Sequence, residues 1–109
     1  MLSEKAIKAV NSVTEAIKES QEYKDFEKDK KLVKDNPQTR DLVEKVKNIQ
    51  LRLMNIPEDE RNSDYAESLL NEYEEITENT AVYDYSRAES LYVTMLQEVL
   101  GSIVESVDL

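Results

Sequence analysis

The sequence of 109 residues contains no cysteine, no histidine and no tryptophan. Without cysteine the chain can form no disulfide, and without cysteine or histidine it lacks the two side chains that build most structural zinc sites. Histidine and cysteine also supply many of the bases and nucleophiles of enzymes. We therefore expect no catalytic, cofactor or metal site, and a protein that is not an enzyme.

Residues that break regular structure are scarce. One glycine, Gly101, and two prolines, Pro37 and Pro57, occur in the whole chain. A β-fold needs many tight turns, and a phosphate-binding loop needs several glycines, so both are disfavoured. Helix-forming Glu, Lys, Leu and Ala are abundant instead. The composition predicts a single all-α domain over residues 1–109, an antiparallel bundle of about five helices with a long C-terminal helix.

Long hydrophobic runs are also missing, since no more than about three apolar residues follow one another. A transmembrane helix needs about 20 such residues and a signal peptide at least about seven. We therefore expect a cytoplasmic protein without a membrane partner.

Positive charge is scarce in the second half of the chain. Residues 1–56 carry 12 basic and 10 acidic residues, whereas residues 57–109 carry two arginines and 14 acidic residues. The formal net charge of −10 disfavours direct binding to nucleic acid, because phosphate backbones are also anionic. The unequal halves either fold back on each other or are both solvated faces.

What the chain does contain is apolar residues at helical spacing, every three or four positions. The predicted helices cover residues 3–19, 21–34, 37–55, 64–78 and 81–107, and a charged loop covers residues 57–63. Ser20 is a suitable N-cap for the second helix, and Asn36 followed by Pro37 suits the start of the third. The predicted core faces are Ala6, Ile7, Val10, Val13 and Ile17 in the first helix, Leu42, Val46, Ile49, Leu53 and Ile56 in the third, and Ala66, Leu69, Leu70, Tyr73 and Ile76 in the fourth.

The third and fifth predicted helices carry more apolar residues than one packed face requires. Monomers rarely leave large apolar patches in water, so this surplus predicts assembly through helices, first of all as a homo-oligomer. Tyr83 departs from the main apolar face of its helix, and Arg87 is an isolated cation that suits a carboxylate partner. The predicted interface residues are Val43, Leu51, Met54, Tyr83, Arg87, Leu91 and Met95.

Four segments carry a resemblance to a known family. They are EYKDFEKDKKL (22–32), NPQTRDLVEKVKNIQ (36–50), NEYEEITEN (71–79) and VYDYSRAESLYVTMLQEVLGSI (82–103). Together they resemble the YlbF/YmcA family of control-of-competence regulators in bacteria. The resemblance implies an all-α cytoplasmic regulator that forms homo-oligomers or complexes with paralogues, with roles in competence, sporulation, biofilm formation and, through an endoribonuclease, messenger-RNA processing. The iron–sulfur cluster of some members does not carry over, because the cysteine ligands are missing, and Thr80 stands where the family often has proline.

The sequence therefore favours a non-enzymatic regulatory adaptor that acts through helix-mediated binding and self-assembly. An alternative is an acidic, chaperone-like or structural helical protein that holds a basic client through residues such as Glu74, Glu75 and Glu78. A third possibility is a hydrolase that depends on carboxylates, although the carboxylates are expected to face solvent.

Overall fold

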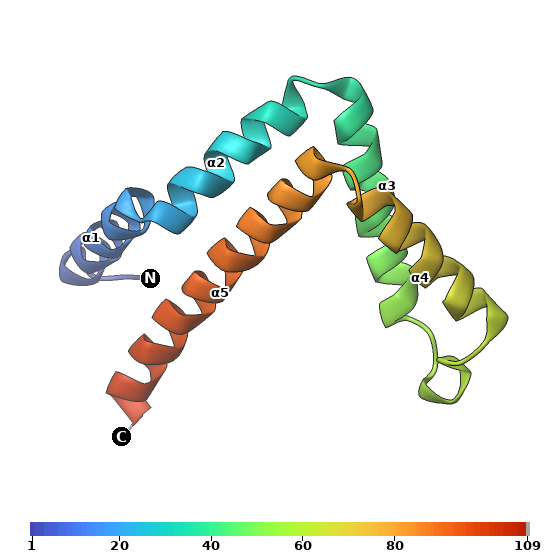
Figure 1. The fold of residues 1–109 in the computed structure, drawn as a ribbon. Coiled ribbons are helices and arrows are strands. Elements are labelled where there is room, and N and C mark those ends of the chain that lie inside the picture. Colours follow the sequence, from blue (N-terminus) through green and yellow to red (C-terminus); the bar gives the residue numbers. More distant parts are fainter. Residues whose placement is uncertain (109) are drawn as a thin grey trace. The chain divides into compact units, whose positions relative to one another are not determined.

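A computed structural model describes residues 1–108, and this part of the chain is all-α with no β-strand, as predicted (Figure 1). Its elements are α1 (Glu4–Glu19), α2 (Gln21–Lys34), α3 (Pro37–Met54), the short 3-10 helix η1 (Glu58–Glu60), α4 (Asp64–Thr77) and α5 (Thr80–Asp108). The prediction of five helices with a long C-terminal helix is confirmed, and the predicted ends agree to within about a residue.

Local capping residues explain where the helices begin. The hydroxyl oxygen of Ser3 accepts a hydrogen bond from the backbone N–H of Ala6, and that of Ser63 accepts one from Ala66. At the start of α3 the side-chain oxygen of Asn36 accepts from the N–H groups of both Gln38 and Thr39. These bonds satisfy donors that the first turn of a helix leaves without a partner.

The described chain forms two compact units. One consists of residues 1–28 together with 87–108, and the other of residues 29–86. They are called here the terminal unit and the central unit. The helices α2 and α5 each begin in one unit and end in the other.

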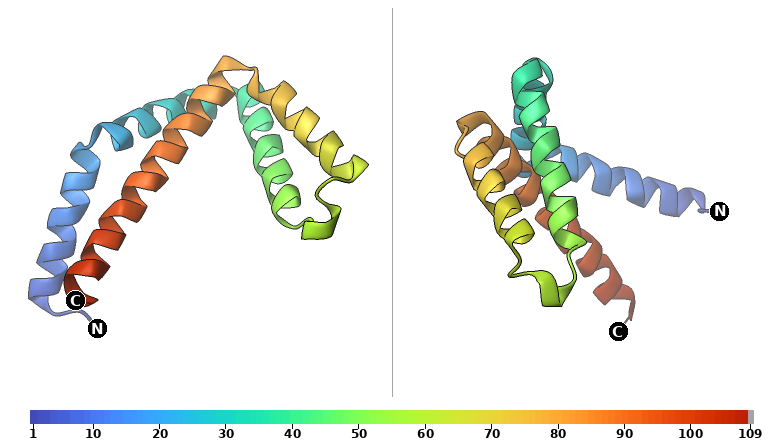
Figure 2. Two further views of the ribbon diagram at one scale, coloured as in Figure 1. Left: turned by 60° about the horizontal axis from the view of Figure 1, so that its bottom comes forward. Right: turned by 90° about the vertical axis from the view of Figure 1, so that its right-hand side faces the viewer.

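The central unit is built on an antiparallel pair, α3 and α4, joined by the loop that contains η1 (Figure 2). Its core consists of the buried residues Ile49, Ile56, Ala66 and Leu69, against which Leu53, Tyr73 and Ile76 pack. Val82, in the first turn of α5, is also fully buried. At about 25 cal/mol per Å² of apolar surface, burial of this core stabilises the α3–α4 pair.

The structure corrects two predicted faces. Val43, predicted to lie off the core face of α3 and to serve as an interface residue, is buried, with 6% of its surface exposed. The buried row of α3 runs through Thr39, Val43 and Val46 at the spacing of one helix face. Leu70, predicted to be in the core, is 46% exposed, because it points about 100° away from its buried neighbour Leu69 and α3 covers only one side of α4.

The terminal unit is packed less completely. No residue of α1 is buried, and no described residue of α5 beyond Ala88 is buried. One aromatic cluster joins α2 to α5: the ring of Tyr92 stacks on Phe26 at 5.0 Å between centroids and meets Tyr23 edge-on at 5.8 Å. The core face predicted for α1 is therefore wrong in part: Ile7 and Val10 are 46% and 52% exposed, because nothing in the described chain covers that side of the helix fully.

Candidate protein-interaction surface

Three of the four predicted interface residues of the central unit are exposed. Leu51 and Met54 are exposed on α3, and Tyr83 is exposed in the first turns of α5, as expected from its departure from the apolar face. Val43, the fourth of these residues, also belongs to α3 but is buried.

The predicted residues of the terminal unit do share a face. Arg87, Leu91 and Met95 follow one another at intervals of four on α5, so they lie along one side of the helix. Arg87 and Leu91 are exposed and Met95 is half-buried. The exposed part of this strip is narrow, since it consists of the Leu91 side chain, part of Met95 and the charged Arg87.

A larger apolar surface lies elsewhere in the terminal unit. A groove of about 500 Å³ separates α1 from the C-terminal half of α5, which run in opposite directions along its two sides (Figure 2). It is lined from α1 by Ala9, Val10, Val13, Thr14 and Ile17, and from α5 by Leu96, Val99, Leu100 and Ile103. Thr14 is the only lining residue with a polar side-chain atom, and its hydroxyl donates to the backbone oxygen of Val10 at 2.9 Å. The Thr14 hydroxyl hydrogen is thus engaged within α1, and the rest of the lining is apolar.

Both sides of the groove follow a heptad pattern, in which apolar residues alternate at intervals of three and four. On α5 the pattern runs through Val93, Leu96, Leu100, Ile103 and Val107, here called the α5 heptad face. On α1 it runs through Ile7, Val10, Thr14 and Ile17. This spacing is typical of helices that pack against other helices along their length.

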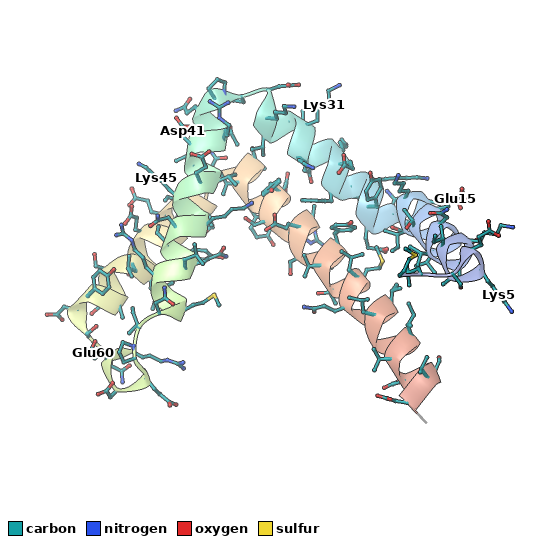
Figure 3. All side chains as sticks on the ribbon, turned by 180° about the vertical axis from the view of Figure 1, so that it is seen from behind. Lys5, Glu15, Lys31, Asp41, Lys45 and Glu60 are labelled. Atoms are coloured by element: carbon teal, nitrogen blue, oxygen red, sulfur yellow. The ribbon has the colours of Figure 1, made fainter. Side chains whose placement is uncertain are left out.

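Charged side chains avoid the groove. Figure 3 shows Lys5 and Glu15 at the periphery of α1, pointing away from α5. Along the part of α5 that lines the groove, the carboxylates of Glu98 and Glu105 are seven residues apart and lie on the side of the helix opposite the heptad face. An apolar groove with distant charges is suited to bind an apolar helix.

A second hollow, in the central unit, has a different character. It measures about 530 Å³, lies between α3 and α4, and is lined mostly by polar groups of both signs, such as Asp41, Lys45, Arg52 and Glu72. Asp41 and Lys45 lie one turn apart on the same side of α3 (Figure 3). Opposite charges one turn apart on an exposed helix stabilise it by only a few tenths of a kcal/mol, roughly.

The tyrosines belong mainly to packing. Tyr85 is buried, and the Lys47 ammonium donates a hydrogen bond of 3.3 Å to its hydroxyl while lying 5.4 Å from the centre of its ring. Among residues 1–108 no group of three or more acidic side chains is placed to hold a metal ion. In the same part of the chain, every helix is too short or too polar to cross a bilayer.

Sequence reasoning missed the groove although its residues were recognised as apolar. The α1 residues were assigned to a core, and the surplus on α5 was assigned to the strip around Leu91 and Met95. A signal was present: α5 carries no charge on its heptad face, and α1 repeats the same spacing. The two patterns do not show by themselves that α1 and α5 lie side by side.

Comparison with known proteins identifies the family. The family model described as control of competence regulator ComK, YlbF/YmcA matches residues 6–108, which is nearly the whole chain. No curated protein and no solved structure matches the chain. The matched region includes both sides of the groove and the α3–α4 pair, and the all-α fold is the one that the resemblance implied. The chain therefore belongs to the YlbF/YmcA family of control-of-competence regulators.

Proposed function

We propose that the protein is a non-enzymatic regulatory adaptor of the cytoplasm, which acts by binding helices of other proteins and by assembling with itself. The observation that carries this proposal is the groove between α1 and α5, an apolar surface with a helical repeat and without a reactive group. Such a surface can recognise another helix through its apolar face.

Family membership supports the regulatory part of the proposal, because the family consists of competence regulators. The acidic character of the chain supports binding to protein rather than to nucleic acid, since the net charge is −10. Paralogous family members, or an endoribonuclease that they control, are the partners that we propose beyond the chain itself.

The first test is the absolute mass of the full chain, measured by light scattering behind size exclusion over a range of protein concentrations. We expect a species of at least twice the 12.6 kDa of one chain. A mass that stays at 12.6 kDa at every concentration would rule out self-assembly, and only the binding of a different protein would then remain of the proposal.

The regulatory role is tested in the host cell. Deleting the gene should change the frequency of transformation, and the wild-type gene should restore it. A groove variant such as Leu100→Glu should fail to restore it, whereas Leu51→Glu, on the exposed side of α3, should restore it. If both variants restore transformation, the groove has no part in the regulatory function.

A further inference from the structure

We propose that the hollow between α3 and α4 is the docking site for a basic helix of a partner protein. The hollow belongs to the central unit, so this site is distinct from the groove between α1 and α5 and goes beyond the proposed function, which rests on that groove. An adaptor with both surfaces has one for apolar helices and another for charged helices.

The wall that α3 contributes to the hollow has the spacing of a helix contact. It is formed by residues at intervals of four, three and four positions, namely Asp41, Lys45, Asn48 and Arg52. Residues at this spacing follow one side of a helix, here over about 16 Å, or about three turns. Leu69 and Glu72 line the opposite wall, on the antiparallel helix α4. The hollow therefore has the direction and the length of a third helix laid along the pair.

The hollow is too open and too polar for a small molecule. Six of its eight lining residues have charged or amide side chains, and all six are exposed. The two apolar ones, Ile49 and Leu69, are only 4% and 5% exposed because they belong to the core. Small-molecule sites enclose most of their ligand and are mainly apolar. The lining therefore favours side chains that the fold of a partner holds in place.

The charges in the hollow are available to such a partner. Among residues 1–108, the side chains of Lys45, Arg52 and Glu72 form no hydrogen bond or ion pair. Each exposed pair with a partner adds little affinity by itself. The order of several charges, however, determines which partner fits and in which register.

The two ends of the hollow differ in charge. Three carboxylates and one lysine give one end a net negative charge, namely Asp41, Glu44, Glu72 and Lys45. Glu72 belongs to this end because α4 runs antiparallel to α3, so that the chain beyond Leu69 leads towards Asp41 (Figure 2). The other end carries Arg52. A helix with a lysine or arginine at the acidic end and a carboxylate about two turns away, opposite Arg52, matches this order.

The surroundings of the hollow require a partner that is basic overall. Residues 57–78, which include α4 and the loop before it, carry nine acidic residues and one basic residue. Most of the net charge of −10 is therefore concentrated beside the hollow. Such a field attracts cationic surfaces and repels anionic ones. A second copy of the chain, with the same net charge, is disfavoured as the occupant.

The first test uses a synthetic helical peptide of alanine and lysine in which one glutamate follows a lysine by seven residues. The full chain, isotope-labelled for NMR, is titrated with this peptide. We expect amide shifts centred on residues 41–52 and 69–72. A matched peptide with glutamine in place of the glutamate should bind about threefold more weakly, because it lacks the carboxylate for Arg52. General attraction to an acidic protein predicts the opposite, since that peptide is more basic.

Variants of the chain make the same distinction. Arg52→Glu should weaken binding of the glutamate peptide, although it makes the protein more acidic, and should not weaken binding of the glutamine peptide. Glu72→Lys should weaken binding more than Glu74→Lys does, because Glu74 lies on the side of α4 away from the hollow. All three positions are exposed, so the helicity measured by circular dichroism should stay that of the wild type.

Two results would overturn the docking site. If Arg52→Glu strengthens binding of the glutamate peptide, or if Glu72→Lys and Glu74→Lys weaken it equally, the peptide is held by diffuse attraction and not in the hollow.

Complementation in the host cell separates this inference from the proposed function. Glu72→Lys should fail to restore transformation while its absolute mass equals that of the wild type, and Glu74→Lys should restore it. If Glu72→Lys restores transformation and Leu100→Glu does not, the proposed function stands and the hollow has no part in it. The reverse pattern would support the hollow and contradict the role proposed for the groove.

Discussion

Single residues on α3 show how far the environment changes within two positions. Ile49 is 4% exposed in the core of the central unit, whereas Leu51 lies on the opposite, exposed side of the same helix. Both were recognised as apolar in the sequence, but only their neighbours in space decide which one stabilises the fold.

Replacing Ile49 by alanine should therefore lower the free energy of unfolding by about 2–5 kcal/mol, because the buried side chain leaves a cavity. Leu51→Ala is the matched control and should change it by roughly 0.5 kcal/mol or less. Urea denaturation followed by circular dichroism measures both. Equal losses in the two variants would contradict the assigned core.

Gly101 is the one glycine of the chain and lies within α5. A Cβ atom added to it would meet no other atom within 4 Å. Alanine is favoured over glycine in helices by about 1 kcal/mol, and serine lies between them.

We therefore expect Gly101→Ala to raise the free energy of unfolding by about 0.5–1 kcal/mol, and Gly101→Ser to raise it by less. The measurement is the denaturation midpoint at one fixed protein concentration, since assembly also affects stability. The absence of any gain would mean that α5 is frayed at this position.

The burial of single residues was predicted wrongly where it depends on which neighbouring helix packs against a face. Val43 fits the periodicity of the core face as well as Leu42 does, so the pattern alone could not decide between them. Leu70 is adjacent to the core residue Leu69, but it is 46% exposed because α3 packs against a different side of α4. In both cases the contact that decides comes from another helix.

Helix boundaries, in contrast, were predicted almost to the residue. They depend on groups within three residues of each other, such as Asn36 with Gln38 and Thr39, and on Pro37, which suits a first turn. Local chemistry of this kind is fully contained in the sequence.

The cap of α3 gives a prediction at this scale. Asn36→Ala removes the acceptor for two backbone N–H groups and should lower the free energy of unfolding by about 1 kcal/mol. Asn36→Asp retains an acceptor and should keep the wild-type stability. Thermal unfolding of both variants checks this, and a loss in Asn36→Asp as large as that in Asn36→Ala would show that the cap is not responsible.

The groove is an element-scale feature that periodicity could not reveal. The sequence predicted that α1 and α5 have apolar faces, but it did not show that α1 would contribute no buried residue. Whether a face is buried depends on how closely the other helix approaches, and short-range patterns carry no such information. The sequence therefore predicted surplus apolar surface correctly, and Leu51, Met54 and Leu91 are exposed, but it did not show that the face of α1 is left open as well.

Net charge governs the behaviour of the whole molecule. If copies pair through an uncharged face, the rest of each chain still repels the other, and salt screens this repulsion. Raising NaCl from about 50 mM to about 500 mM should therefore strengthen the dimer.

Sedimentation equilibrium at several salt concentrations measures this as a fall in the dissociation constant. Pairing between basic and acidic surfaces would give the reverse, because salt would then screen an attraction. A dissociation constant that rises with salt would therefore indicate that copies pair through opposite charges and not through an apolar face.

The absence of buried residues from α1 has a consequence for the lifetime of the protein. An isolated helix of about this length is marginal in water, so any helix that the groove beside α1 binds, as proposed above, would also stabilise α1. At low abundance its amides should exchange rapidly with deuterium and proteases should cut there first, whereas at high abundance both should slow. The cell would then degrade unassembled copies faster than assembled ones. The amount of assembled regulator would consequently rise more steeply with its rate of synthesis.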